Sequence, residues 1–468
     1  MGFVLSILYF ITYYLTPATM FGPLAAYRIE LILAGLVIVV SLPALTKSFI
    51  LKTPQSLALI GSASAVVLSV LIGERWLGGS VTAFLDFIPN AFAYFLVCLH
   101  CNSKRKLQVL VLMLLSVCLF VIARGSIDLF HGIPLSPPQT AATESGDLNS
   151  NLWEIQHPYI LPMGNDTGET IYRLRGLGSI NDPNDFGQLI VCIIPLMFIY
   201  WRAKKNLRNI IFVILPVCVL LYGVFMTHSR GALLALMAMV IVAVRRRIGT
   251  LPALLMAGGL FAGAMALHFT GGRGISAESG AGRTMLWGEG LEILRAHPLF
   301  GVGLGNMHDF TDEYLTAHNS VVVCAAELGL FGLYFWSMFL FPTVRDALMI
   351  ASPAKVSEGE PVAVEKGLYL QPARKVEEVD TAEVNRLGRL LVLSLAGFLV
   401  AGWFLSRALV MTLFLLGGMA EVVYEVALRR GMIAPRLPLA RVLVYAAGLT
   451  VSLVIVIYIM LRIVNLMH

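Results

Sequence analysis

The chain has 468 residues, of which 58% are hydrophobic and only 13% are charged. Soluble proteins carry roughly 25% charged and 45–50% apolar residues, so a soluble fold of this composition would expose large apolar surfaces and aggregate. The composition also excludes a disordered protein and a secreted disulfide scaffold, and the net charge of +6 is no argument for a nucleic-acid partner. We therefore expect an all-α, polytopic integral membrane protein with about 12–13 transmembrane helices.

Apolar segments of roughly 20 residues, the length that crosses a bilayer, follow one another along the chain. N-terminal transmembrane helices are predicted within 1–123, at 3–21, 29–46, 55–73, 80–99 and 107–123. Central transmembrane helices are predicted within 186–269, at 186–201, 209–227, 231–244 and 251–269, and a single helix at 319–341. C-terminal transmembrane helices fill 390–468, at 390–408, 409–427 and 440–461, with one re-entrant hairpin as the alternative for 390–427.

The basic residues predict the orientation of these helices. Of the 34 Lys and Arg residues, 23 lie in alternate loops, and these include every Lys in the chain. The positive-inside tendency places these loops in the cytoplasm together with the N-terminus. Thirteen spans would place the C-terminus outside, and twelve, with 390–427 as the miscounted segment, would place it inside. The cytoplasmic set includes one long loop at 342–389, whereas 124–185 and 270–318 become two long periplasmic loops. Residues Pro134–Ser150 of the first are expected to be irregular.

The eleven remaining basic residues face outward in this prediction, and all of them are Arg. A guanidinium is a planar, permanently charged fork that binds phosphate through two hydrogen bonds. The alternative is that Arg side chains simply extend to the membrane interface. We expect several of these arginines to form an anion site.

Two arginines, Arg173 and Arg175, precede a predicted helix that starts at Phe186 with Asn184 or Asp185 as its cap. Arginines beside a helix N-terminus attract anions, although a well-capped helix start is the alternative. His228 and Arg230 lie in a tight outer hairpin between two spans. An Arg held there faces a polar cavity or extends to the interface.

The second long loop contains a predicted amphipathic helix from Arg283 to about Ala296, followed by a glycine-rich turn over 300–306. A cation at a helix start opposes the helix dipole, which suggests an anion nearby, with Glu278 as the alternative partner. His318 lies just before the next span, where it can accept a proton from a hydroxyl or serve only as an interfacial residue. Glu327 lies inside that span, where it is a functional group or a structural hydrogen-bond partner. The scattered His residues give no metal-ligand pattern, so we expect no metal and no cofactor.

These residues resemble the O-antigen ligase/polymerase superfamily of bacterial envelope glycosyltransferases, which includes protein O-oligosaccharyltransferases. The resemblance covers about 175–335. Its motifs are Arg175 with Asn181-Asp182-Pro183-Asn184, Ser229-Arg230-Gly231-Ala232, Arg283-x-x-x-Trp287, His297-Pro298-Leu299-Phe300-Gly301-Val302-Gly303, His318-Asn319 and Glu327-Leu328-Gly329.

The resemblance implies an inverting, metal-independent transferase in the bacterial inner membrane, with its active site facing the periplasm. It implies transfer of a glycan en bloc from undecaprenyl pyrophosphate to a hydroxyl of lipid A-core, another glycan or a protein. His318, Arg283 and Arg230 would be catalytic, with His318 as the general base. Arg230, Arg283, Arg175 and Arg173 would bind the diphosphate, supported by Asn319, Glu327 and His228.

Several functions remain open at this point. Ligase-like transfer is favoured over polymerisation and over protein O-glycosylation, because the long loop 270–318 carries the base. A transporter or flippase for anionic lipid-linked substrates is the alternative from another class. It would need its basic groups near the middle of the membrane rather than at the outer boundary.

Overall fold

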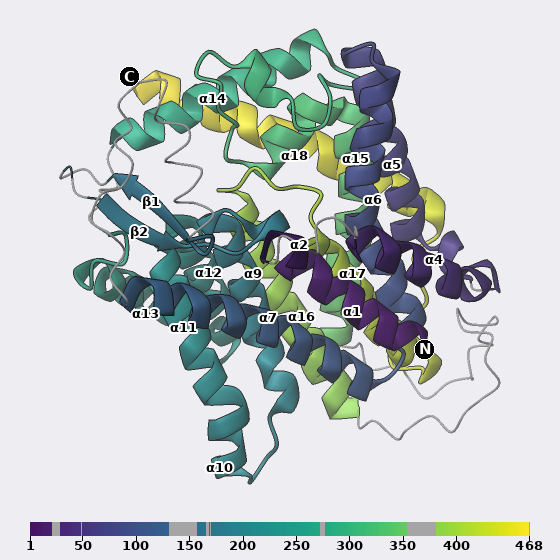
Figure 1. Cartoon of the computed structure of the whole chain (residues 1–468), viewed down its shortest axis with the longest axis vertical. Coiled ribbons are helices and arrows are strands. Elements are labelled where there is room, and N and C mark those ends of the chain that lie inside the picture. The colour runs from purple at the N-terminus through teal and green to yellow at the C-terminus, as the bar shows by residue number, and fades with distance from the viewer. Residues whose placement is uncertain are drawn as a thin grey trace.

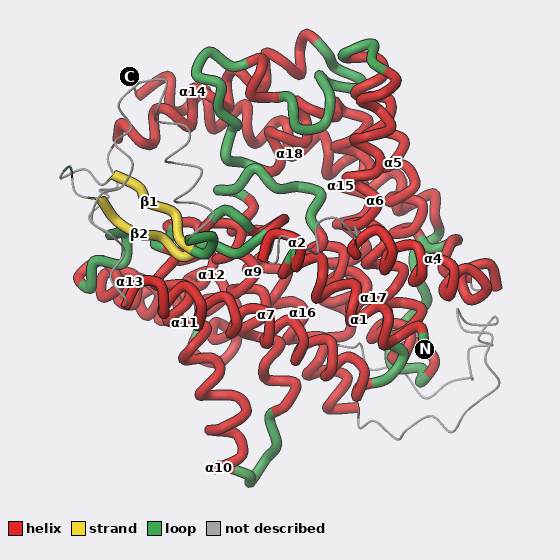
Figure 2. The backbone as a smooth tube through the Cα atoms, in the orientation of Figure 1, coloured by secondary structure: helices red, strands yellow, loops and turns green. Residues whose placement is uncertain are grey.

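The computed structural model describes residues 1–20, 29–47, 49–130, 157–164, 168, 170–271, 277–352 and 381–467. Over these residues the protein is a bundle of helices with one short strand pair, as Figure 2 shows, which confirms the predicted all-α membrane class. The first part of the bundle consists of α1 (Gly2–Leu15), α2 (Pro17–Met20), α4 (Ile29–Lys47), α5 (Pro54–Gly73), α6 (Leu77–His100) and α7 (Lys104–Phe130). The central part consists of α9 (Pro183–Leu196), α10 (Asn206–Asn209), α11 (Leu215–Thr227), α12 (Arg230–Ile248) and α13 (Thr250–Ala266). The last part consists of α14 (Ala277–Ala296), α15 (Ser320–Ala351), α16 (Thr381–Gly402), α17 (Met411–Arg429) and α18 (Leu439–Met467).

Ten helices within the described residues are long and apolar enough to cross a membrane. They correspond to ten of the predicted spans, and the two shorter apolar helices, α1 and α13, correspond to two more. The predicted span at 231–244 is α12, whose last turn carries Arg245, Arg246 and Arg247. At 390–427 the structure has two separate helices, α16 and α17, each long and apolar enough to span.

The basic loops that were predicted to share one side gather at one end of the bundle. Lys104, at the start of α7, forms an ion pair with Glu383 at the start of α16. Nη1 of Arg246, at the end of α12, donates to Oγ of Ser352 at 2.8 Å. Because the helices alternate in direction, the segments that carry the predicted site lie at the opposite end.

Several predicted boundaries need correction. Helix α7 continues beyond 123 to Phe130, so the first long loop starts later than predicted. Helix α15 continues beyond 341 to Ala351, and α16 already begins at Thr381, so both ends of the predicted loop 342–389 are helical. The remainder of that loop, and the segment 134–150, lie outside the described residues. In each case the helix extends into a polar stretch, because hydropathy marks the apolar part of a helix rather than its end.

Strands β1 (Ile160–Gly164) and β2 (Thr170–Leu174) form an antiparallel pair in the first long loop, with Leu161 opposite Arg173. The sequence prediction missed this pair. The alternation of Ile171, Arg173 and their neighbours is too short to stand out from loop sequence.

Helix α15 packs against α5, α16, α17 and α18. Figure 1 shows it beside α5 and α18. Helix α14 packs across the first part of α15 and also contacts α18. The N-terminal end of α15 therefore lies where the long loop, α14 and the bundle meet, and this is the region of the predicted base.

Candidate active site

The turn before α12 holds Arg230 by backbone geometry. Ser229 caps this helix, and its hydroxyl accepts from the backbone N–H of Ala232 at 3.3 Å. The preceding residue, His228, has a left-handed backbone (φ 48°), and its Nδ1–H donates to the Phe269 carbonyl at 2.7 Å. Non-glycine residues rarely adopt this conformation, so the surroundings hold the turn in one shape. Arg230 is thereby fixed as the first residue of α12.

Arg283 and Trp287 lie one turn apart on α14. This helix begins at Ala277, earlier than the predicted start, so Arg283 is not at its N-terminus. The side chain of Glu278, the alternative partner of Arg283, lies outside the described residues. Nε1 of Trp287 donates to the Ala317 carbonyl at 2.9 Å, directly before His318. Because Arg283 and Trp287 lie one turn apart on the same helix, this hydrogen bond connects the helix that carries Arg283 to the segment that carries His318.

His318 is held between two fixed neighbours. Its own backbone is left-handed (φ 47°), and its N–H donates to Oγ of Ser406 at 3.0 Å. The next residue, Asn319, is fully buried and caps α15, accepting from the N–H groups of Val321 at 2.9 Å and Val322 at 3.2 Å. His318 is therefore positioned by its own chain, by the indole of Trp287 and by Ser406.

Electrostatic interactions link these residues. Burial lowers the pKa of Arg283, and the nearby charge of Arg230 lowers it further. Burial also lowers the pKa of His318, as does Arg283, whereas Asp182 acts in the opposite direction. The positive charges of Arg283 and Arg230 therefore interact with each other, and Arg283 also interacts with the imidazole of His318. Within the described part of the chain, no carboxylate forms an ion pair with Arg283.

The glycine-rich turn and the Glu327-Leu328-Gly329 motif form one unit. The backbone N–H groups of Val302 and Gly303 donate to the carbonyls of Ala326 (3.1 Å) and Glu327 (2.9 Å), and Leu330 donates to Pro298 (2.8 Å). Helix α15 is interrupted at Gly329, which has a positive φ of 66°. The loop occupies this break, and the Glu327 carboxylate accepts from the backbone of Gly305 and Met307. Glu327 is thus a hydrogen-bond partner of the loop.

Arg173 and Arg175 occupy different surroundings. Arg173 is only 4% exposed, its Nε donates to the Thr227 carbonyl at 2.9 Å, and its Nη2 donates to Oδ1 of Asn184 at 3.0 Å. These hydrogen bonds therefore link the strand pair to the first turn of α9 and to the last residue of α11. Nε of Arg175 donates to the Pro158 carbonyl at 3.1 Å.

The cap of α9 differs from the prediction. Helix α9 begins at Pro183, and Asp182 accepts from the N–H of Asn184 at 2.7 Å. The prediction of Asn184 or Asp185 as the cap was wrong because Pro183 occupies the first helical turn, which proline favours.

Three residues near His318 were not assigned to the site from the sequence: Asp182, which was quoted only within its motif, Ser406, and Arg407, which was only one of the eleven outward arginines. Nε of Arg407 pairs with Oδ2 of Asp185 at 2.8 Å. The α16–α17 connection that carries Ser406 and Arg407 is distant in sequence from His318, so no local pattern could reveal it. The Asn181–Asn184 motif could have indicated Asp182.

A polar cavity of about 460 Å³ opens beside His318. Its wall includes Asp86 and Asn90 of α6, Asp182, and Ser406 and Arg407 of the α16–α17 connection, but neither Arg230 nor Arg283. Among the described residues, no group of three His, Cys, Asp or Glu side chains is arranged to hold a metal ion.

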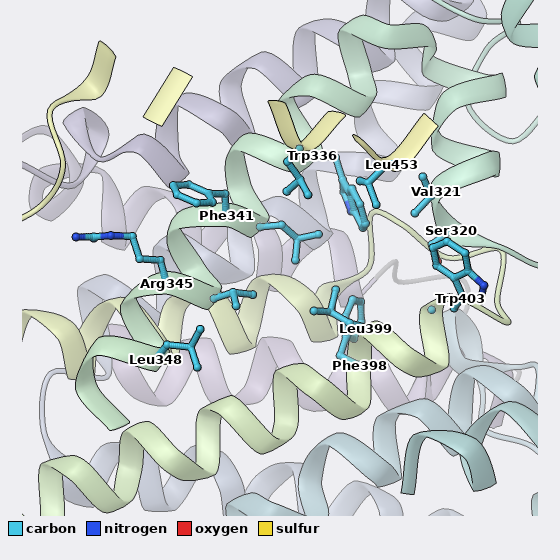
Figure 3. Close-up of a pocket in the computed structure, with 14 residues that line it drawn as sticks. Ser320, Val321, Trp336, Phe341, Arg345, Leu348, Phe398, Leu399, Trp403 and Leu453 are labelled. Atoms are coloured by element: carbon cyan, nitrogen blue, oxygen red, sulfur yellow. The ribbon is translucent and has the colours of Figure 1, made fainter. Parts of the chain in front are cut away.

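A second, apolar cavity of about 450 Å³ lies between α15, α16 and α18, and Figure 3 shows its lining. Ser320 and Trp403 lie at one end of this cavity and Arg345 at the other. The indole of Trp403 meets Trp287 edge-to-face, with ring centroids 5.8 Å apart. Its neighbour Phe404 packs against Gly231 at the start of α12, where an added Cβ would lie 3.1 Å from the phenylalanine Cβ. The apolar cavity therefore begins next to the helices that carry Arg230 and Arg283.

One comparison with known families bears on this region. A family model described as O-antigen ligase matches residues 215–337. This part of the chain is therefore similar to O-antigen ligases. The match runs from α11 into α15, so it contains Arg230, Arg283 and His318, whereas Arg173, Arg175, Asp182 and Arg407 lie outside it. No curated protein matches the chain significantly. The helical bundle is that of a multi-pass membrane protein, and its central region is similar to O-antigen ligases.

Proposed function

We propose that this protein transfers a glycan en bloc from undecaprenyl pyrophosphate to an acceptor hydroxyl, on the periplasmic face of the bacterial inner membrane. The observation that carries the proposal is that Arg283 interacts electrostatically with both Arg230 and His318. Two guanidinium charges that lie close together in a half-buried site create a positive potential that favours a bound anion. A diphosphate carries the charge and the oxygen atoms that such a pair binds best.

The chemistry follows from these residues. Departure of the diphosphate builds negative charge, which fixed guanidinium donors stabilise without a metal ion. The lowered pKa keeps the imidazole of His318 neutral near pH 7, so it can accept the proton of the acceptor hydroxyl. The reaction is inverting, because the hydroxyl displaces the diphosphate directly. Asn319 supports the base as the helix cap beside it, Glu327 holds the glycine loop, and His228 fixes the turn before Arg230.

The apolar cavity supports a lipid-linked donor. It begins beside the arginine-bearing helices and is lined almost entirely by apolar side chains such as Leu399 and Leu453. A polyprenyl chain attached to a diphosphate at Arg230 and Arg283 would enter it past Trp403. We assign this cavity to the carrier chain.

The same arrangement fits an O-antigen or exopolysaccharide polymerase and a protein O-oligosaccharyltransferase, which differ only in the acceptor; lipid A-core is the acceptor we favour. A transporter or flippase is disfavoured. Arg230 is the first residue of α12 and Arg283 lies on α14, which is outside the candidate spans, so the charges are at one end of the bundle.

The test is to incubate the purified protein with undecaprenyl-pyrophosphate-linked oligosaccharide and with lipid A-core. One glycan unit on the core identifies a ligase, and a ladder on the carrier identifies a polymerase. His318→Gln should lower the transfer rate by roughly 10²–10⁴-fold, the usual contribution of a general base. His308→Gln is the matched control, because the partly exposed His308 pairs with its neighbour Asp309 and lines neither cavity. Full activity in His318→Gln, or loss of activity in EDTA, would contradict the mechanism.

A further inference from the structure

The polar cavity beside His318 contains an unusual carboxylate. Asp86 lies within α6, a candidate membrane span, yet its side chain is exposed. A charged group inside a membrane span is costly and is found where it faces a water-filled space or a functional partner. The polar cavity is that space, since Asp86 lines it together with His318.

The other polar groups of this wall are held in place by protein contacts. Asp185 is paired with Arg407, and Oδ1 of Asn90 accepts from the Tyr13 hydroxyl at 2.6 Å. Asp182 uses one carboxylate oxygen to cap α9. Within the described residues Asp86 forms no ion pair. The wall also contains apolar side chains such as Phe87 and Leu409, so it suits the polar and apolar faces of a neutral sugar, whereas its carboxylates repel a diphosphate.

The direction of the reaction points to the same cavity. In an inverting displacement the attacking oxygen and the leaving oxygen are on opposite faces of the anomeric carbon. With the diphosphate at Arg230 and Arg283, the acceptor must reach His318 from a space whose wall contains neither arginine. The polar cavity meets this condition, and its volume lies within the range of ligand pockets, roughly 300–1,000 Å³.

We propose that this cavity is the acceptor subsite and binds the sugar that carries the attacking hydroxyl, with Asp86 as a specificity-determining residue; this rests on the proposed function. The hydroxyl proton passes to His318 as the acceptor oxygen bonds to the anomeric carbon. The bond from that carbon to the phosphate oxygen breaks, and its electron pair leaves on the diphosphate. Asp86 accepts hydrogen bonds from other hydroxyls of the same sugar.

The experiment is initial-rate kinetics of the full chain, with undecaprenyl-pyrophosphate-linked oligosaccharide as donor and deacylated core oligosaccharide as acceptor probe. Asp86→Asn should raise the KM for the acceptor by about tenfold, since a hydrogen bond to a charged group is replaced by a weaker one, and leave the donor KM unchanged. Leu409→Trp, which fills the cavity without changing charge, should have the same selective effect. Asp309→Asn is the matched control, because Asp309 is exposed and outside the cavity.

The outcomes separate the two proposals. A wild-type protein that transfers glycan, combined with unchanged acceptor KM in both cavity variants, overturns the acceptor subsite alone. A rise in donor KM instead of acceptor KM also overturns it. A wild-type protein that transfers no glycan to any acceptor overturns the proposed function and this inference together. If Asp86→Asn fails to fold, the acceptor KM of Leu409→Trp tests the acceptor subsite.

Discussion

The charge and the shape of Arg283 have separate roles, because a guanidinium offers two parallel N–H donors and an ammonium offers a point charge. Arg283→Lys should therefore keep the positive charge and still lose about tenfold or more in transfer rate, with a larger loss in Arg283→Ala. The measurement is kcat/KM for the lipid-linked donor. Arg295→Lys, on the exposed end of the same helix, is the control. Wild-type activity in Arg283→Lys would show that transfer does not depend on the two parallel N–H donors of the guanidinium.

Asp182 affects the base through space, because its charge opposes the lowering of the His318 pKa by burial and by Arg283. Asp182→Asn preserves the cap of α9, since Asn caps helices as well as Asp. Removing the charge lowers the His318 pKa further. Activity is lost at acidic pH as His318 becomes protonated, so this acidic limb of the pH–rate profile should move to lower pH in Asp182→Asn. The charges that face His318 are Arg283 from α14, Asp182, and Arg407, Asp185, Asp86 and Glu327 around the cavity.

An unchanged or upward-shifted acidic limb in Asp182→Asn would contradict the coupling to His318. A variant that merely weakened α9 would lower kcat at every pH without moving the limb. The profile therefore distinguishes an electrostatic role from a structural one.

At the scale of elements, the break in α15 and the glycine loop depend on close backbone contact. A Cβ at Gly301 would lie 2.4 Å from the Glu327 carbonyl carbon, and one at Gly329 would lie 2.3 Å from the Leu299 oxygen. Both glycines also have positive φ. Gly301→Ala and Gly329→Ala should each destabilise the fold by more than about 1 kcal/mol and lower activity. Thermal unfolding in detergent gives the measurement.

Gly288→Ala on α14 is the matched control for these two substitutions, because a Cβ there meets nothing within 4 Å. It should leave the unfolding temperature unchanged or raise it slightly, as Ala favours the helix by roughly 0.5–1 kcal/mol over Gly. Equal unfolding temperatures in Gly301→Ala, Gly329→Ala and Gly288→Ala would contradict the conclusion that the glycine loop and the break in α15 require close backbone contact.

The elements themselves divide into those that sequence could predict and those that it could not. Hydropathy alone located the spans, since a membrane-crossing segment such as Asn206–Thr227, which ends in α11, is mostly one long apolar run. It misplaced the ends of α7 and α15, which extend into polar sequence, and it missed the strand pair. The break at Gly329 was not predicted either, because it depends on a loop that docks from 300–306.

The candidate site shows the same division. Residue chemistry and the family resemblance predicted Arg230, Arg283 and His318 as site residues, and in the structure Arg283 interacts electrostatically with the other two. Arg173 was predicted to bind an anion for the same reason, because it is also one of the outward arginines. Its buried hydrogen bonds to Thr227 and Asn184 show that it also holds the surrounding elements together. Ser406 escaped because its bond to His318 joins residues far apart in sequence.

At the scale of the whole molecule, the apolar cavity predicts a dependence on the length of the carrier. Leu453→Trp on α18 narrows this cavity and should raise the KM for an undecaprenyl donor at least several-fold, as overpacking an apolar site costs roughly 1–3 kcal/mol. A short-chain prenyl donor should be affected less. Val456→Trp, on the same helix but outside the cavity, is the control. Equal KM for both donors in Leu453→Trp would contradict the assignment.

The two cavities share no lining residue, and the first turn of α15 and the α16–α17 connection lie between them. This separation has a kinetic consequence. Under the two proposals, the donor in one cavity and the acceptor in the other occupy the enzyme simultaneously, so we expect transfer through a ternary complex and not by alternate occupation of a common site. Double-reciprocal plots against the two substrates should intersect. The undecaprenyl diphosphate that remains after transfer can then return to the lipid bilayer while the glycosylated product still occupies the polar cavity.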